Sequence, residues 1–261
     1  MKAKKSFGQN WLRDEYVLDK IVDSANLKSS DSVLEVGPGL GTLTQKLVSS
    51  GVDIWAVEAD QDLIPGLKKR FKNAKNLKII PEDILKFDMG KMPEGYKVVA
   101  NIPYYLTSNL IRTLLEASNK PTLMVMLVQK EVAERILAKP GSMSVLAFSV
   151  LYYARPEFVM EVGRELFDPI PRVDSAIIKI SCLNQQLFDA DTQKLFRLVK
   201  SGFGEKRKML RNSLSGGLGV ETADIERILT ESKISLTSRA QELSMSDWHN
   251  LYRASIASNL I

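Results

Sequence analysis

Short apolar runs alternate with segments of helical spacing along the first half of the chain. The runs occupy residues 33–36, 54–57, 77–80, 98–100 and 123–128. Between them, apolar residues recur every three or four positions, as on one face of a helix. Continuous apolar runs of this length are typical of strands buried on both faces. The pattern predicts a parallel, doubly wound α/β sheet of Rossmann-like type, which binds ligands at the carboxyl ends of its strands.

The pattern changes in the second half of the chain. Two apolar runs at 157–162 and 176–180 predict an antiparallel pair at the sheet edge, joined by a proline-rich connection. From about residue 185 the spacing is helical throughout. The predicted helices cover 189–202, 206–215, 221–232 and 246–258, with Gly216-Gly217 as a break. We therefore predict a cofactor-binding catalytic domain over residues 1–184 and a small all-α domain over residues 185–261.

Three glycines at alternate positions follow the first apolar run. Gly37, Gly39 and Gly41 precede a helix that starts at Thr42. Glycine lets the backbone approach a ligand closely and adopt positive φ. The spacing is G-x-G-x-G, whereas a dinucleotide site requires G-x-G-x-x-G. Glu35 lies two residues before the turn, where it would repel phosphate, so the turn favours a cationic ligand such as S-adenosylmethionine.

Polar residues also follow two other predicted strands. Glu58 ends the second strand, roughly 20 residues after the first glycine, where an acid can accept hydrogen bonds from a ribose. Asn101-Ile102-Pro103-Tyr104 follows the fourth strand. The Asn101 amide oxygen and a backbone carbonyl near Pro103 are placed to accept the two N–H bonds of an adenine amine. Pro103 stiffens the loop, and Tyr104 offers a ring on which an extruded base can stack. These residues predict methyl transfer to adenine by placement and fixed dipoles.

The composition excludes several kinds of chemistry. The 261 residues include one cysteine, Cys182, and one histidine, His249, so no intrachain disulfide and no Cys/His zinc site is expected. We interpret both residues as structural and expect no metal. A hydrophobic content of 44% with 26% charged residues is ordinary for a soluble globular protein. No apolar run reaches the roughly 18 residues of a membrane span. We therefore expect a cytoplasmic protein without membrane contact.

Positive charge is concentrated in two segments. The net charge is +5, yet residues 194–211 alone carry seven basic side chains and one acidic side chain, and residues 1–10 carry three lysines. Separate basic patches on a nearly neutral body suggest a polyanionic partner such as RNA. The residues that we expect to contact it are Lys200, Lys206, Arg207, Lys208 and Arg211.

Eight blocks distributed over nearly the whole chain resemble one family. They are Lys5–Leu12, Glu35–Gly41, Ala56–Asp60, Glu82–Leu85, Asn101–Tyr104, Gln129–Ala133, Phe167–Ala176 and Phe203–Asn212. In these blocks the chain resembles the ribosomal RNA adenine dimethyltransferases, and most of all the bacterial type that acts on small-subunit RNA. Because so many blocks occur in the same order, the probability that the resemblance arose by chance is very small.

The resemblance implies a cofactor, a substrate and roles for individual residues. S-adenosylmethionine contacts would come from Asn10, Leu12, Gly37, Glu58, Asp83 and Asn101, in addition to Glu35 and Gly39 of the turn. Asp83 would lie near the adenine amine of the cofactor, and Phe167 would face Tyr104 across the target base. The implied product is dimethyladenosine at two neighbouring adenosines near the 3′ end of 16S RNA. The implied partner is the assembling small subunit (the pre-30S particle), and we expect the enzyme to act as a monomer.

Some positions depart from the family pattern. Residues 140–145 lack the Tyr-Gly expected before the helix that follows. Trp11 replaces the usual phenylalanine, and Ile102 replaces a common leucine; both changes are conservative.

Three alternatives stay open at this point. A nucleotide-dependent oxidoreductase is disfavoured by the glycine spacing and by Glu35. A non-catalytic RNA-binding assembly factor would be expected to lack the intact Asn-x-Pro-Tyr loop. A large-subunit RNA dimethylase of the antibiotic-resistance kind is disfavoured by the block Phe203–Asn212.

Overall fold

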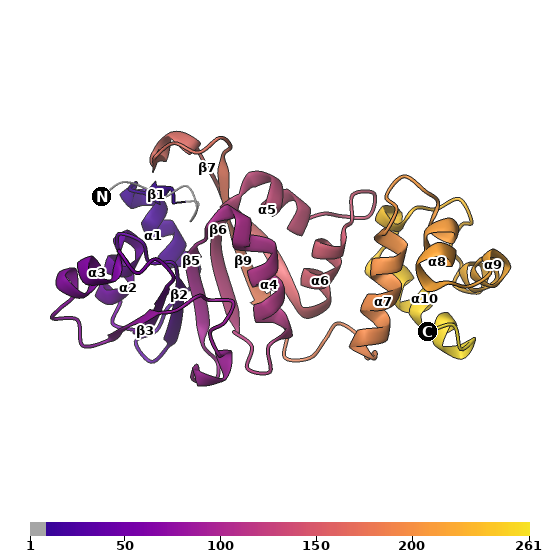
Figure 1. Ribbon diagram of the computed structural model, residues 1–261, viewed down its shortest axis with the longest axis horizontal. Helices are drawn as coiled ribbons and strands as arrows, with labels where there is room; N and C mark the ends of the chain where they lie inside the picture. Colours follow the sequence, from indigo (N-terminus) through magenta and orange to yellow (C-terminus); the bar gives the residue numbers. More distant parts are fainter. Residues whose placement is uncertain (1–8) are drawn as a thin grey trace. The chain divides into compact units, whose positions relative to one another are not determined.

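The computed structural model describes residues 9–261 (Figure 1). Residues 5–8 of the first family block and the three N-terminal lysines therefore lie outside the described residues. Contacts divide the chain into two compact units. The first consists of Met1–Glu134 and Ala154–Asn184, and the second of Arg135–Tyr153 and Gln185–Ile261.

The first unit is built on a seven-stranded sheet. Its strands are β2 (Ser32–Val36), β3 (Asp53–Glu58), β4 (Leu77–Pro81), β5 (Lys97–Asn101), β6 (Leu123–Gln129), β7 (Ala154–Val162) and β9 (Ser175–Cys182). They are ordered β4-β3-β2-β5-β6-β9-β7. The first five are parallel, and β9 runs antiparallel to both β6 and β7. The predicted doubly wound fold with an antiparallel pair at one edge is confirmed.

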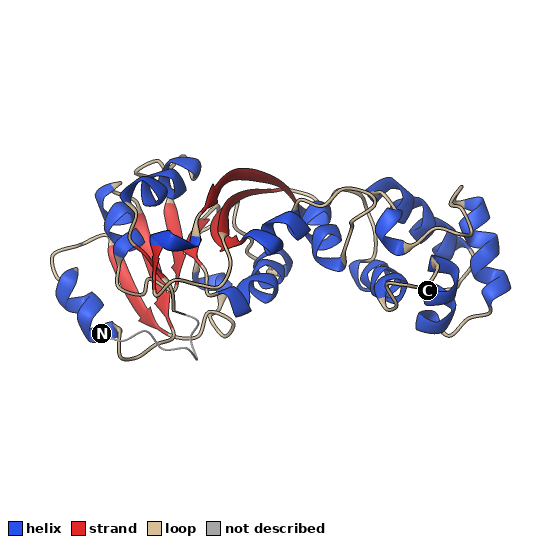
Figure 2. Cartoon of the chain, turned by 90° about the horizontal axis from the view of Figure 1, so that it is seen from above, coloured by secondary structure: helices blue, strands red, loops and turns tan. Residues whose placement is uncertain are grey.

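Helices cover both faces of this sheet (Figure 2). They are α1 (Glu15–Ser24), α2 (Thr42–Ser49), α3 (Ile64–Arg70), α4 (Thr107–Glu116) and α5 (Lys130–Ile136), with short 3-10 turns η2 (Met89–Lys91), η3 (Tyr104–Leu106) and η4 (Arg164–Leu166). Leu18 of α1 and Leu47 of α2 join strand residues such as Val33 in one core cluster. Leu34 and Val98 point to the opposite face and are equally buried, because successive strand residues alternate in direction.

The strand order reverses between β2 and β5. The chain proceeds from β2 to β3 and β4 on one side, and then returns to place β5 on the other side of β2. A crevice forms at such a switch point, at the carboxyl ends of the two central strands. The glycine turn after β2 and the Asn101 loop after β5 therefore meet at one place.

A separate two-stranded sheet was not anticipated from the sequence. Residues Trp11–Leu12 form β1, which pairs antiparallel with β8 (Phe167–Asp168). Two-residue strands are too short to show any period, which is why the hydrophobic pattern missed them. The Arg13 guanidinium also lies 2.7 Å from the Asp168 carboxylate. This pairing brings the N-terminal segment beside Phe167, more than 150 residues away along the chain.

The second unit is helical. It contains α6 (Val145–Tyr153), α7 (Thr192–Phe203), α8 (Leu210–Leu218), α9 (Thr222–Glu231) and α10 (Met245–Ala257), with the 3-10 turn η5 (Ala240–Glu242). The division differs from the predicted boundary after residue 184, because residues 135–153 group with the helices. Most of α6 is buried, and its Phe148 ring lies 5.6 Å from Phe196 of α7 and 6.0 Å from Trp248 of α10.

The predicted break at Gly216-Gly217 is wrong. Both glycines lie inside α8, which ends at Leu218 and is followed by its C-cap, Gly219, in the left-handed conformation. Close packing against α7 explains the glycine at 217, since a Cβ there would lie 2.7 Å from that of Ser201. The helix also begins at Leu210 instead of residue 206. The basic residues 206–208 therefore lie in the turn between α7 and α8.

Candidate active site

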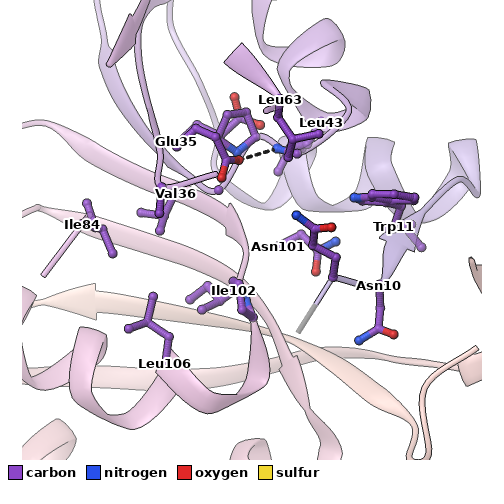
Figure 3. Close-up of a pocket in the computed structure, with 18 of the residues that line it drawn as sticks. Asn10, Trp11, Glu35, Val36, Leu43, Leu63, Ile84, Asn101, Ile102 and Leu106 are labelled. Atoms are coloured by element: carbon purple, nitrogen blue, oxygen red, sulfur yellow. Dashed lines mark hydrogen bonds between the residues drawn. The ribbon is translucent and has the colours of Figure 1, made fainter. Parts of the chain in front are cut away.

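A pocket opens at the carboxyl ends of β2, β3 and β5 (Figure 3). The figure labels side chains from β1, β2, β5 and the loop after β4, all of which line this pocket. Every residue predicted to bind the cofactor or the target base is among the lining residues: Asn10, Leu12, Glu35, Gly37, Gly39, Glu58, Asp83, Asn101, Pro103, Tyr104 and Phe167. The topology thus gathers residues that are distributed over 158 positions of the chain.

The glycine turn forms one wall of the pocket. Gly39 has φ +60°, and a Cβ at this position would lie 3.4 Å from the indole of Trp11. A side chain would therefore be both strained and crowded, so the backbone stays open to a ligand. Gly41, at φ +82°, is required for packing and not for access of a ligand. A Cβ there would come within 2.6 Å of the Phe71 ring, so this glycine serves the packing of α3 against the turn.

Glu58 is a buried carboxylate held by backbone donors. Its two oxygens accept the N–H groups of Gly39 (3.0 Å) and Asp60 (2.8 Å), and the residue is 6% exposed. Burial raises the pKa of Glu58, and the backbone N–H groups oppose the rise. Asp60 in turn accepts a hydrogen bond from the Gln9 amide at 2.8 Å. The end of β3 and the glycine turn are therefore tied together through one carboxylate, which also lines the pocket.

Glu35 is the most deeply buried acid of the site. It is 1% exposed, and neither carboxylate oxygen has a hydrogen-bond partner among residues 9–261. Burial raises the pKa of Glu35 to about 8. The Thr44 hydroxyl lies near enough to oppose the rise, yet its oxygen also lacks a partner of good geometry among these residues. A buried acid without a donor fits a ligand that brings a positive charge, as S-adenosylmethionine does.

The Asn101 loop presents two hydrogen-bond acceptors. The Asn101 side chain makes no hydrogen bond to the part of the chain that the structure describes. The Ile102 N–H donates to the Leu127 carbonyl (3.3 Å), and the Pro103 carbonyl accepts the Leu106 N–H (3.0 Å). The Ile102 carbonyl receives no hydrogen bond from the described residues. The backbone acceptor expected near Pro103 is therefore the carbonyl of Ile102.

Two aromatic rings line the pocket beyond this loop. Tyr104 is half-buried, and its hydroxyl lies 2.8 Å from the Ser175 hydroxyl. Phe167 is only 3% exposed and belongs to the core cluster that contains Leu12 and Leu18. Both rings reach the pocket wall, but Phe167 presents only a small part of its surface. Their placement in one pocket is consistent with the prediction that they hold a base, which stays a prediction.

A profile of the family described as "Ribosomal RNA adenine dimethylase" matches residues 1–253. The chain belongs to this family. The resemblance predicted from the eight blocks is thereby confirmed, and so is the enzyme class, an S-adenosylmethionine-dependent RNA adenine dimethyltransferase. The N-terminal and C-terminal blocks are both inside the matched range.

Individual relatives agree with the family match. The dimethylase is 42% identical over 258 residues to ribosomal RNA small subunit methyltransferase A of Dehalococcoides mccartyi. The matched region covers 96% of this chain and 88% of the relative. It is 37% identical to the protein of the same name from Clostridioides difficile, covering 100% of this chain and 91% of that one.

Two solved structures share the fold of the dimethylase over most of its length. The dimethyladenosine transferase of Plasmodium falciparum matches with a TM-score of 0.80 at 28% identity, covering 95% of this chain and 98% of the other. The 23S rRNA methyltransferase ErmE matches with a TM-score of 0.75 at 26% identity, covering 94% and 99%.

Several pocket residues of the dimethylase had no predicted role. Tyr105 lines the pocket although its side chain is 65% exposed, and the nearby Asp83 and Glu58 carboxylates add to the effect of burial in raising its pKa. Ile84 is buried beside Asp83, whose carboxylate accepts the Leu85 N–H at 3.0 Å. The signals in the sequence that pointed to them were the place of Ile84 inside the block Glu82–Leu85 and that of Tyr105 directly after the block Asn101–Tyr104.

The basic residues of the helical unit are not equivalent. Lys200, Lys206 and Arg207 are exposed, and none of them forms an ion pair with a described residue. Lys208 lies 2.6 Å from Glu205, with both side chains more than half exposed. Arg211 is different, because its guanidinium lies 2.6 Å from the Glu226 carboxylate and its side chain is 31% exposed. Arg211 therefore ties α8 to α9, whereas the other four side chains face solvent.

The remaining reactive residues have packing roles in the dimethylase. Burial raises the pKa of the Cys182 thiol, at the end of β9, to about 12. The His249 ring stacks on Phe188 with 4.2 Å between ring centroids. Across residues 9–261 we find no cluster of three or more side chains suited to bind a metal. In the same range, no helix combines the length and the apolar character needed to cross a membrane.

Proposed function

We propose that this chain transfers methyl groups from S-adenosylmethionine to the exocyclic amines of two adjacent adenosines near the 3′ end of 16S RNA, giving dimethyladenosines. The observation that carries the proposal is the convergence, in one pocket, of an unpartnered buried acid, an oriented carboxylate and the acceptors of the Asn101 loop. The first two suit the methyl donor, and the third suits the amine that receives the methyl group.

Residues of β2, β3 and the loop after β4 would hold the donor. Bound S-adenosylmethionine would supply an electrophilic methyl group. The turn around Gly39 would leave room for it, Glu58 would accept hydrogen bonds from its ribose, and Asp83 would accept one from its adenine amine. Glu35 would balance its positive charge, which favours it over a nucleotide phosphate.

The Asn101 loop would hold the target base. The Asn101 side-chain oxygen and the Ile102 carbonyl would accept the two N–H bonds of the adenine amine and orient its nitrogen. Asn101 ends β5, and the Ile102 backbone is held by the hydrogen bond from its N–H to the Leu127 carbonyl, so both acceptors would need little reorganisation during the reaction. The nitrogen becomes acidic as it is alkylated, so its proton can leave to water without a dedicated base. Tyr104 and Phe167 would contact the faces of a base removed from its helix.

Relatives that match nearly the whole chain support the small-subunit RNA as substrate. Relatives 37% and 42% identical are named small subunit methyltransferase A, whereas ErmE, named for 23S rRNA, is 26% identical. The intact Asn101 loop argues against a non-catalytic assembly factor. The exposed turn at residues 206–208 would contact the RNA backbone of the assembling particle, and we propose that the enzyme does so as a monomer.

Methyl transfer to isolated subunits tests the proposal. Small subunits that lack the modification would be incubated with labelled S-adenosylmethionine, and the modified bases would be mapped by mass spectrometry. We expect four methyl groups per subunit, on two neighbouring adenosines near the 3′ end, and incorporation roughly 100- to 1,000-fold slower in a parallel reaction with Asn101→Ala. Incorporation into large-subunit RNA alone would contradict the proposed substrate, and no incorporation into either RNA would contradict the proposed reaction.

A further inference from the structure

A hydrogen bond joins two residues that are 71 positions apart in the sequence. The Tyr104 hydroxyl and the Ser175 hydroxyl lie 2.8 Å from one another. Ser175 is fully buried, at 0% exposure, and does not line the pocket itself. It is the one hydrogen-bond partner of the Tyr104 side chain within residues 9–261. The bond therefore connects a pocket residue to a residue behind the pocket wall.

Ser175 is held from both sides. It is the first residue of β9, opposite Gln129 at the end of β6 and Val162 at the end of β7. The preceding residue, Asp174, accepts the Lys130 N–H through its carbonyl at 3.0 Å. Its carboxylate accepts a further N–H, that of Arg164, at 3.1 Å. The Ser175 hydroxyl is thus attached to a backbone that two strands and two flanking hydrogen bonds fix in place.

Fewer contacts hold Tyr104 in place than hold Ser175. It lies in the short 3-10 turn η3, which is closed by a hydrogen bond from the Leu106 N–H to the Pro103 carbonyl. Its ring is half-buried, so packing restrains only part of it. Burial also raises the pKa of the Tyr104 hydroxyl, so that the group stays neutral and keeps its proton at physiological pH. The orientation of the ring then depends on where its hydroxyl is anchored.

The anchor also connects the two aromatic residues of the pocket. Phe167 begins β8, and the chain reaches Ser175 eight residues later, through a loop that contains a cis peptide bond before Pro169. The hydroxyl of Tyr104 is therefore hydrogen-bonded to Ser175, the last residue of the segment that begins with Phe167. A base held by the two rings needs a fixed separation between them, and this bond is a direct link between their segments.

We propose that Ser175 is a positioning residue, which holds the Tyr104 ring at the orientation that grips the target adenine. The inference rests on the proposed function, because it assigns Ser175 to the RNA step of that reaction. Ser175 touches neither substrate. Its loss should reduce methylation through Tyr104 alone and leave binding of S-adenosylmethionine unchanged.

A double-mutant cycle tests this coupling. Ser175→Ala removes one hydroxyl, Tyr104→Phe removes the other and keeps the ring, and the double variant removes both. We expect each single change to lower kcat/KM for small subunits about five- to tenfold, as the loss of one buried hydrogen bond does. The double variant should be no slower than the slower single variant. Donor affinity, measured by calorimetry, should match the wild type in all three.

Two further variants distinguish positioning from general stability. Ser255 is also 0% exposed, and its hydroxyl donates to the Leu251 carbonyl at 2.7 Å in α10. Ser255→Ala removes an equally buried hydroxyl in the other unit and should leave the kinetics unchanged. Ser175→Thr keeps a hydroxyl and should recover more activity than Ser175→Ala if it folds with a similar Tm.

Several results would overturn the inference. One is a double variant whose loss equals the product of the two single losses, because the hydroxyls would then act independently. Others are wild-type kinetics for Ser175→Ala, or a loss of donor affinity that parallels the loss of turnover. If wild-type protein fails to methylate small subunits, the proposed function fails. If wild type is active and Ser175→Ala equals it, only the role of Ser175 fails.

Discussion

The pocket of the first unit and the basic turn of the second unit use polar groups in opposite ways. In the pocket, Glu35 and Glu58 are almost completely removed from solvent, and Asn101 is half-buried. In the turn between α7 and α8, Lys206 and Arg207 are exposed, and the neighbouring Lys208 is paired with an equally exposed acid. One region consists of a few buried groups and the other of several exposed charges.

This difference determines how each region can recognise a ligand. A polar group in a low-dielectric pocket interacts strongly, and it is unfavourable when it lacks a partner. Exposed charges interact through water, and salt screens them within about 10 Å. Single substitutions should therefore have large, salt-independent effects in the pocket, and small, salt-dependent effects in the basic turn.

The largest effect is expected at Asn101. Asn101→Ala removes the side-chain acceptor that we propose for the target amine, and we expect turnover to fall roughly 100- to 1,000-fold. Donor affinity should change little, because the glycine turn and Glu58 remain. Single-turnover methylation and calorimetric titration with S-adenosylmethionine measure the two quantities. A variant that methylates at the wild-type rate would rule out this role for the amide.

Glu58 should affect the donor instead. Glu58→Ala removes a charged acceptor, and we expect the affinity for S-adenosylmethionine to fall roughly 10- to 100-fold. Because the Glu58 carboxylate also accepts hydrogen bonds from the N–H groups of Gly39 and Asp60, we expect the Tm of the variant to fall as well. The exposed Glu94 provides a control, since Glu94→Ala should change neither quantity. Equal donor affinity in both variants would contradict the assignment.

Glu35 should make the stability of the ligand-free protein depend on pH. Its pKa is about 8 in the folded protein against 4.5 as a reference, so between these values only the folded state holds the proton. The free energy of unfolding should therefore decrease as pH rises from about 5 to about 8, by at most about 1.4 kcal/mol per unit. Glu35→Gln should lack this contribution, as denaturant titrations at several pH values can measure. Parallel curves for the two proteins would show that Glu35 is ionised throughout.

The smallest effect is expected in the basic turn. Lys206→Glu combined with Arg207→Glu should weaken RNA binding several-fold at physiological salt. It should also lower the slope of log K against log salt by about two, one unit for each lost phosphate contact. Lys68→Glu with Lys69→Glu on α3 makes the same change in net charge elsewhere and serves as the control. An unchanged slope in the turn variant would mean that these charges only face solvent.

Arg211 sharpens the comparison within the helical unit. Its ion pair with Glu226 is partly buried, so Arg211→Ala should lower Tm by leaving that carboxylate without its partner. Lys206→Ala should leave Tm unchanged, because the side chain is exposed. Thermal unfolding of the two variants separates a structural cation from one that is available to RNA. Equal Tm values would place Arg211 with the exposed group.

Local pattern was sufficient for the strands of the sheet and for the residues at their ends. Apolar runs identified β2 to β6, and the carboxyl ends of parallel strands meet at one edge, so Gly37, Glu58 and Asn101 were predicted to converge. This inference needs only the period of the chain and a topological rule. It succeeded because each residue belongs to the strand end that positions it.

Contacts between distant segments were decided by the tertiary structure. The pairing of β1 with β8, the grouping of α6 with the helical unit and the bond between Tyr104 and Ser175 join residues that no local period relates. The glycines inside α8 were misread for the same reason, since their role lies in the close approach of α7. The sequence by itself determined the alternation of elements and the chemistry at the strand ends, because both depend on neighbours along the chain. Which side chains are buried, paired or left free depends on neighbours in space, and only the folded chain supplies them.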